Sequence, residues 1–181
     1  MKKYKEYIDY SEYAGLCNIL VHKIEKSEDY KTKQLCFVYG IPSGGLPLAV
    51  HLTKHLNLEL ILDLNSIKYE KGKILICDDI SDTGQTISKL FSDNKYCGFE
   101  FLKERSLVAT LCVKEDSIQQ PDFYCFVVDP QIWVVFPWED YNEEMIKGQH
   151  YRLKWTASKD PQAAEQLLTK RAFAASDPTI R

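Results

Sequence analysis

The chain has 181 residues, a length that suits one domain with a proper hydrophobic core. Hydrophobic residues make up 45% of it, which excludes a largely disordered protein, and a formal net charge of −3 gives no general attraction to nucleic acid or to anionic membranes. No apolar run is as long as a membrane span, and the first residues lack a signal-peptide core. We expect a cytoplasmic protein that binds neither nucleic acid nor membrane.

The cysteines support this expectation. Cys36, Cys77, Cys112 and Cys125 lie inside apolar runs, and no two cysteines form a Cys-x-x-Cys pair. This pattern predicts that the cysteines are small buried hydrophobic residues of a protein in a reducing compartment. It does not favour disulfide partners or zinc ligands.

The N-terminal third carries three predicted elements: a helix, a strand and a second helix. Residues 4–26 have apolar side chains partly at helical spacing, and Ser11 with Glu12 could open a helix of about a dozen residues that packs on the core. The run Leu35–Tyr39 predicts a buried strand. It leads through a loop with three glycines into a helical stretch, Leu46–His55. Such a loop can turn backbone amides toward an anion, although taken alone an ordinary strand-to-helix turn explains it better.

A third strand is predicted over Leu58–Leu64, and after a short connection the central stretch begins at Lys73. The apolar run Ile74–Cys77 predicts a buried strand that ends in two adjacent carboxylates. A tight polar segment follows, and then apolar residues resume at helical spacing. Strand, polar turn and helix present unpaired N–H groups at the helix start, where phosphate binds. A plain turn with Asp82 or Thr83 as the helix N-cap is the alternative.

The string ICDDISDTGQT, residues 76–86, resembles the phosphoribosyl-diphosphate (PRPP) signature of the type I phosphoribosyltransferases. The resemblance implies an α/β fold, with a mainly parallel sheet and helices on both faces. It implies that the 5′-phosphate and ribose of PRPP bind to this string, with Mg²⁺ held by Asp78 and Asp79, and that Asp82 is the general base. The residues it assigns to PRPP are Asp78, Asp79, Ser81, Thr83, Gly84, Gln85 and Thr86.

The glycine loop gains a role from the same resemblance, because a similar loop in the family holds pyrophosphate. This role falls on Ser43, Gly44 and Gly45. Relatives close to xanthine-guanine phosphoribosyltransferase have Ser-Arg-Gly-Gly there, so the basic residue is missing here. Active members also carry a long flexible lid, where this chain has only Asn65–Gly72. Both departures favour the alternative of a PRPP- or nucleotide-binding regulator with little catalysis.

The base-binding end is expected in the last third. Strands are predicted over Ser106–Val113 and Phe123–Val128, and an aromatic run follows. In the resembled purine enzymes a lysine after the first of these strands donates to the 6-oxo group, and an aromatic stacks on the purine. This implies that Lys114 contacts the base, that Trp133 stacks on it and that Val134 offers its carbonyl. An exposed lysine and an ordinary core aromatic are the alternatives.

We predict that residues 1–150 form one domain and that residues 151–181 are an extension with one helix and a loose tail. In parallel sheets, ligands lie at the carboxyl ends of the strands, so the proposed residues should converge there. The hypothesis is a Mg²⁺-dependent, homo-oligomeric transferase that joins PRPP to guanine, hypoxanthine or xanthine. A receiver-like signalling domain is a third option, although receivers carry their acidic pair after the first strand.

Overall fold

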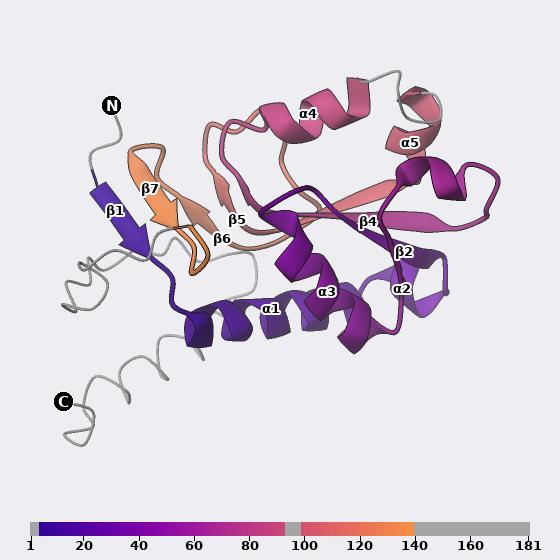
Figure 1. Cartoon of the computed structure of the whole chain (residues 1–181), viewed down its shortest axis with the longest axis horizontal. Helices are drawn as coiled ribbons and strands as arrows, with labels where there is room; N and C mark the ends of the chain where they lie inside the picture. Colours follow the sequence, from indigo (N-terminus) through magenta and orange to yellow (C-terminus); the bar gives the residue numbers. More distant parts are fainter. Residues whose placement is uncertain (1–3, 93–98, 140–181) are drawn as a thin grey trace.

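A computed structural model describes residues 4–92 and 99–139. Its centre is a five-stranded, fully parallel sheet with the strand order β3-β2-β4-β5-β6 (Figure 1). A second, two-stranded parallel sheet pairs β1 with β7. The strands are β1 (Tyr4–Tyr7), β2 (Leu35–Gly40), β3 (Glu59–Ile61), β4 (Lys73–Ser81), β5 (Ser106–Lys114), β6 (Phe123–Val128) and β7 (Ile132–Val135).

Helices connect these strands. A capping box starts α1, because the Asp9 side chain accepts from Glu12 N at 2.8 Å while Glu12 Oε2 accepts from Asp9 N at 3.2 Å. The helix therefore begins at Tyr10, one residue before the predicted start, and runs for 16 residues. The helices are α1 (Tyr10–Glu25), α2 (Glu28–Lys31), α3 (Gly45–Leu56), the 3₁₀ helix η1 (Leu64–Ile67), α4 (Gln85–Ser92) and α5 (Phe99–Arg105).

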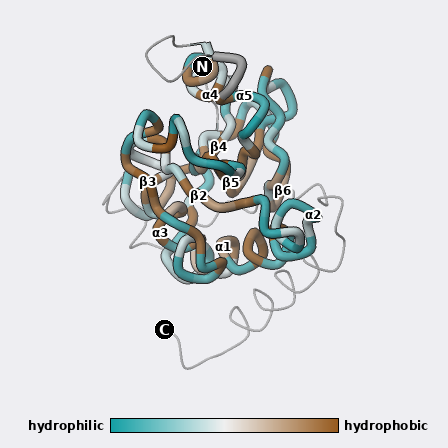
Figure 2. The backbone as a smooth tube through the Cα atoms, turned by 90° about the vertical axis from the view of Figure 1, so that its right-hand side faces the viewer, coloured by the Kyte–Doolittle hydropathy of each residue, from teal (hydrophilic) through white to brown (hydrophobic). Residues whose placement is uncertain are grey.

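The helices cover both faces of the main sheet, as the end-on view in Figure 2 shows. Leu75 and Cys77 of β4 belong to the core beneath α1 and α3. Ile74 and Ile76 of the same strand belong to the core beneath α4, α5 and η1. Since successive side chains of a strand point to opposite faces, β4 is apolar on both. The predicted fold class, a mainly parallel α/β sheet with helices on both faces, is confirmed.

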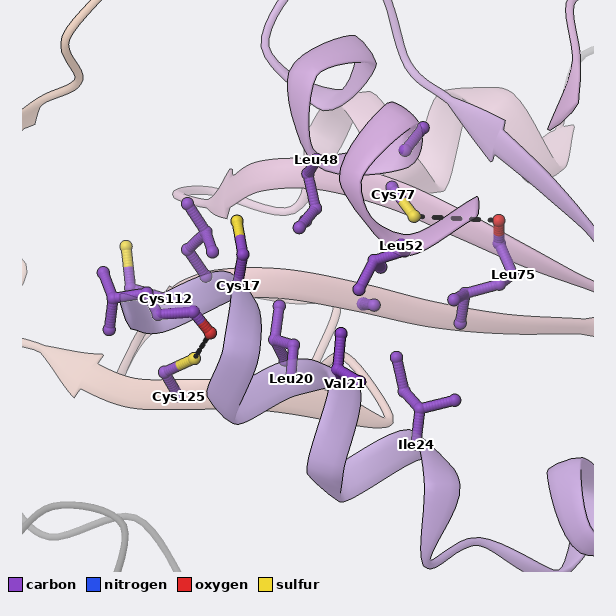
Figure 3. Packing of buried hydrophobic residues seen from close by; sticks show 14 of the residues in the cluster. Cys17, Leu20, Val21, Ile24, Leu48, Leu52, Leu75, Cys77, Cys112 and Cys125 are labelled. Atoms are coloured by element: carbon purple, nitrogen blue, oxygen red, sulfur yellow. Dashed lines mark hydrogen bonds between the residues drawn. The ribbon is translucent and has the colours of Figure 1, made fainter. Parts of the chain in front are cut away.

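The larger core lies between the sheet and the helices α1 and α3, and Figure 3 shows side chains of α1, α3, β4, β5 and β6 that pack together there. Cysteines from α1, β4, β5 and β6 take part in this packing. The five cysteines in the described parts of the chain are all free thiols, in agreement with their expected role as small hydrophobes.

The strand order reverses between β2 and β4. From β2 the chain moves outward to β3, then crosses back to β4 and continues the other way to β6. The loops after β2 and β4 therefore leave the same edge of the sheet and diverge, and a crevice opens between them. Ile41 N donates to Cys77 O at 2.9 Å, which fixes the start of the first loop against β4.

Three predicted boundaries are wrong. β4 continues through Ser81, beyond the predicted end at Cys77, because its pairing with β5 extends to Ser81 opposite Val113. β3 keeps only three residues, and the chain then enters η1, which takes up part of the connection expected as a lid. Tyr4–Tyr7, expected with a packing helix, forms β1. The predicted extension over 151–181 lies outside the described residues.

Within residues 4–92 and 99–139, none of the helices is both long enough and apolar enough to span a bilayer.

Candidate functional site

A pocket of about 290 Å³ occupies the crevice at the point where the strand order reverses. Three segments line it. They are the β2–α3 loop (residues 41–44), the end of β4 with the β4–α4 loop (residues 78–84) and the first turn of α4, and Glu139 after β7. Loops at such a reversal are where parallel α/β folds bind ligands, so this pocket is the candidate site.

The β4–α4 loop offers backbone donors to this pocket. Gly84 has a φ of 77°, a left-handed conformation that favours glycine. Thr83 and Thr86 are exposed and line the pocket, while Gln85 is exposed but does not line it. The first N–H groups of α4 have no partner within the helix, and the helix dipole adds positive charge there. This end of the pocket suits a phosphate group.

Ser81 lines the pocket, but its side chain is engaged by another loop. Its hydroxyl donates to the carbonyl oxygen of Gln119 at 2.7 Å and lies 2.8 Å from the hydroxyl of Ser117, and the residue is buried. The side chain is thus occupied by the β5–β6 loop, which spans residues 115–122. Any contact of Ser81 with a ligand would have to come from its backbone.

The acidic pair lies inside β4. Asp78 Oδ1 accepts from Asp79 N at 3.1 Å, and Asp79 Oδ1 accepts from Ile80 N at 2.8 Å. Neighbouring residues of a strand point to opposite faces, so Asp78 shares the face of α4 and Asp79 the face of α3. Both line the pocket, and they differ in what surrounds them.

Burial perturbs both carboxyl groups. It raises the pKa of Asp78 to about 7, with a further contribution from the negative charge of Asp79. It raises the pKa of Asp79 to about 6, where the hydrogen bond from Ile80 N acts in the opposite direction and the charge of Glu139 adds to the rise. The two buried carboxyl groups therefore bring negative charge together where it is poorly solvated, an arrangement that favours a cation.

The donor set at this position fits magnesium. Mg²⁺ prefers oxygen ligands, keeps several waters and is commonly held by one or two carboxylates together with substrate phosphates. Asp78 and Asp79 supply such carboxylates. Over the described part of the chain, no three His, Cys, Asp or Glu side chains gather as a metal site of their own. A magnesium ion at this position would need further ligands from water or from substrate phosphates.

The β2–α3 loop forms the opposite wall. Ser43 and Gly44 line the pocket, whereas Gly45, also expected there, does not. Gly45 begins α3 and lies against β4, where a Cβ atom would come within 3.1 Å of the Cα of Asp78. Its role is close packing of the helix on the strand. The peptide bond between Pro42 and Ser43 is cis.

The three residues expected to bind the base do not line this pocket. Lys114 is 1% exposed, and its ammonium donates to the carbonyl oxygen of Asp129 at 2.9 Å and to that of Ile132. Trp133 is 43% exposed, and Val134 is buried. Trp133 and Val134 belong to the separate β1–β7 sheet. They therefore do not lie at the carboxyl ends of the main-sheet strands, where the other predicted residues converge.

The sequence analysis missed two features of the site. Glu139 lines the pocket, and its Oε2 accepts from Phe136 N at 3.0 Å, which turns the chain back after β7. The support of Ser81 by Ser117 comes from a residue 36 positions away. A carboxylate at the end of the aromatic run was a visible signal for the first, and no local signal marks the second.

No protein-family model and no curated protein sequence matches the chain. Solved structures do match. The purine phosphoribosyltransferase of Pyrococcus horikoshii has a TM-score of 0.59 at 24% identity, over 76% of this chain and 96% of that one. The xanthine-guanine-hypoxanthine phosphoribosyltransferase of Helicobacter pylori has a TM-score of 0.61 at 19% identity, over 81% and 99%.

A hypothetical protein from Neisseria gonorrhoeae with bound ppGpp is similar to the same degree, with a TM-score of 0.61 at 17% identity over 81% of this chain and 96% of that one. These matches cover nearly the full length of the other chains. Together with the parallel sheet and the pocket at its reversal point, they show that the chain has the type I phosphoribosyltransferase fold.

Proposed function

We propose that the protein is a purine phosphoribosyltransferase, which transfers the phosphoribosyl group of PRPP to a 6-oxopurine and releases pyrophosphate. The observation that carries the proposal is one pocket that joins the PRPP-like string at the end of β4 to the glycine loop after β2. The first wall suits the phosphate and ribose of PRPP, and the second suits its pyrophosphate. The fold shared with known phosphoribosyltransferases supports the assignment.

In this proposal the two ends of PRPP are held by different chemistry. The 5′-phosphate accepts from backbone N–H groups and hydroxyls between Thr83 and Thr86. Asp78 and Asp79 accept from the ribose hydroxyls and hold the hydrated Mg²⁺. Ser43 and Gly44 contact the pyrophosphate with a hydroxyl and backbone N–H groups. Bound Mg²⁺ would neutralise charge on the leaving pyrophosphate.

The reaction itself needs a nucleophile and a base. A ring nitrogen of the purine attacks C1′ of PRPP as the bond from C1′ to the pyrophosphate oxygen breaks. Asp82 takes up or shares a proton near N7 of the purine. This residue is only partly buried and lines the pocket between the acidic pair and Gly84, a place from which it can reach the base.

The base is proposed to lie between Asp82 and β7. Trp133, exposed on β7, presents an aromatic face on which a purine can stack, with the Val134 carbonyl as an acceptor beside it. Lys114, whose ammonium donates to two backbone carbonyls of the β6–β7 turn, is proposed to contact the 6-oxo group of the base. We also propose that the protein is cytoplasmic, that it forms a homo-oligomer, and that residues 151–181 are an extension to the domain.

Nucleotide formation tests the proposal. Purified protein is incubated with PRPP, Mg²⁺ and guanine, hypoxanthine or xanthine, and the nucleoside monophosphate is quantified by chromatography. We expect product with at least one oxopurine and a loss of about 10²-fold or more in the rate for Asp82→Asn, the scale of a general base. Binding of PRPP without any product would contradict the transferase.

A nucleotide-binding regulator is the second candidate. Two observations favour it: the β2–α3 loop has no basic residue, and η1 takes up part of the already short lid segment. The protein of similar fold from Neisseria gonorrhoeae has ppGpp bound. A thermal-shift panel of PRPP, nucleoside monophosphates and ppGpp, each with and without Mg²⁺, separates the candidates when combined with the product assay. Stabilisation without turnover supports the regulator.

A further inference from the structure

The β5–β6 loop (residues 115–122) is hydrogen-bonded to the last residue of β4 and to the β4–α4 loop that follows it. At the first, the buried hydroxyl of Ser81 donates to Gln119 O at 2.7 Å and lies 2.8 Å from Ser117 Oγ. At the second, Ile118 N donates to Thr83 O at 3.1 Å. These bonds lie on either side of Asp82, so they fix the orientation of the backbone from Ser81 to Thr83.

The contact between the loops is also tight. A Cβ atom on Gly84 would lie 2.5 Å from Gln119 N and 2.8 Å from Ser117 Oγ. The glycine is therefore needed for its close approach to the β5–β6 loop as well as for its φ of 77°. No room remains for the β4–α4 loop to relax in that direction.

The supporting loop is itself well anchored. The side-chain amide of Gln120 donates to Ser117 O at 3.1 Å, and Gln119 N donates to Ser117 Oγ at 3.4 Å. Asp122 Oδ2 accepts from Val108 N at 2.7 Å, which ties the far end of the loop to the start of β5. Ser117, 7% exposed, is at the centre of this network.

The second bond determines where one N–H group points. The peptide unit between Thr83 and Gly84 is planar and trans, so its C=O and N–H point in opposite directions. Because the Thr83 carbonyl is held by Ile118, the Gly84 N–H is directed away from the β5–β6 loop. Since Gly84 also lines the pocket, its N–H is taken to face the pocket in the proposal below. Donors held in place in advance bind an anion without an ordering cost.

We propose that Ser117 is a positioning residue: with Ser81 it holds the β4–α4 loop so that the Gly84 N–H is aimed at the phosphate of the ligand. The inference rests on the proposed function, in which this end of the pocket takes the 5′-phosphate of PRPP. It gives Ser81 a role in support of the loop in place of the direct phosphate contact expected from the sequence. Ser117 itself contacts no ligand.

Calorimetric titration with two ligands tests the role, because each ligand engages one wall of the pocket. Ribose 5-phosphate requires the β4–α4 loop, and Mg²⁺-pyrophosphate requires the β2–α3 loop. For Ser117→Ala we expect the Kd of ribose 5-phosphate to rise about fivefold to tenfold, the size of one or two neutral hydrogen bonds, while the Kd of pyrophosphate changes less than twofold.

Three further variants sharpen the result. Ser81→Ala removes the bond between the two hydroxyls together with the bond to Gln119 O, and should also weaken ribose 5-phosphate. Because the two residues share one bond, the double variant should lose less than the sum of the two single losses. Ser117→Thr keeps the hydroxyl and should restore the affinity. Ser106→Ala is the matched control, since its hydroxyl donates to Leu102 O at 2.7 Å at the opposite end of β5. It should lower the melting temperature without changing either Kd.

The outcomes distinguish the role from the function. If wild-type protein does not bind ribose 5-phosphate, both the proposed function and the positioning role are overturned. If wild type binds it and the two alanine variants bind it equally well, only the positioning role is overturned. Equal weakening of ribose 5-phosphate and pyrophosphate would indicate a general loss of structure and would also overturn the role.

Discussion

The carboxylate of Asp79 lies directly against the backbone of Gly44. A Cβ atom on Gly44 would be 2.5 Å from Cγ and 2.8 Å from Oδ1 of Asp79, so a larger residue cannot occupy this position without displacing the carboxylate. The contact joins the two walls of the pocket, the β2–α3 loop and the end of β4.

The first prediction follows from this contact. Gly44→Ala should leave the protein folded, because the collision is confined to the pocket, but should move Asp79 and the β2–α3 loop apart. We expect the Kd of Mg²⁺-pyrophosphate to rise at least about tenfold, measured by calorimetry, with a proportionate loss in product formation.

Gly15→Ala, in the interior of α1, is the control, because helical backbone accepts alanine and gains up to about 1 kcal/mol from it. Wild-type affinity in Gly44→Ala would contradict the argument.

The second prediction concerns pH. Burial raises the pKa of Asp78 to about 7 from its ordinary value of 3.8, so between these pH values the folded state binds more protons than the unfolded state. The free energy of unfolding therefore falls as pH rises through this window. Asp78→Asn keeps the oxygen that accepts from Asp79 N and removes the charge. Without Mg²⁺, it should stabilise the protein by about 1–3 kcal/mol at pH 8 and by little at pH 4.

Urea denaturation at several pH values measures this difference. Added Mg²⁺ should raise the stability of the wild type at pH 8 more than that of Asp78→Asn, because a cation stabilises the charged carboxylate. Asp116→Asn, at an exposed position of the β5–β6 loop, controls for the change in net charge. A stability difference between wild type and Asp78→Asn that does not vary with pH would show that the carboxyl group is not perturbed as described.

The central stretch could be predicted from the sequence because its signals are local. An apolar run, a glycine and a helical spacing lie within residues 74–91, and the structure has a strand, a turn and a helix there. The end of the strand could not be located, since pairing with β5 carries β4 through Asp78 and Asp79 to Ser81. Polar residues gave the appearance of a turn where a neighbouring strand imposes extended backbone.

The residues whose surroundings could not be predicted from the sequence depend on distant partners. Ser81 looked like a phosphate ligand because it belongs to the motif, and its partner Ser117 is fixed only by the tertiary fold. Trp133 continues an apolar run after β6, which suggested the same sheet. Instead, β7 pairs with β1 from the other end of the described chain, where Lys5 is opposite Trp133. Such pairings leave no periodic signal in either segment.

A third prediction separates two roles of Lys114. Its ammonium holds the β6–β7 turn through the carbonyl oxygens of Asp129 and Ile132. Lys114→Met keeps the aliphatic stem and leaves both carbonyls without this donor, so the free energy of unfolding should fall by about 2–3 kcal/mol in urea denaturation. Lys103→Met, at an exposed position on α5, should change it by less than about 0.5 kcal/mol. Unchanged stability with altered selectivity among oxopurines would instead favour a purely base-contacting lysine.

The last prediction tests the base site through Trp133. This residue is 43% exposed and does not line the pocket that suits PRPP, so its removal should affect only ligands that carry a base. For Trp133→Ala we expect the Kd of GMP to rise about threefold to tenfold, the size of one aromatic stacking contact, while the Kd of ribose 5-phosphate is unchanged. Both values come from calorimetry.

Tyr10→Ala is the matched control, because Tyr10 is an exposed aromatic at the start of α1. Equal affinity of wild type and Trp133→Ala for GMP would place the base elsewhere, and a parallel loss of ribose 5-phosphate binding would show that β7 supports the whole pocket.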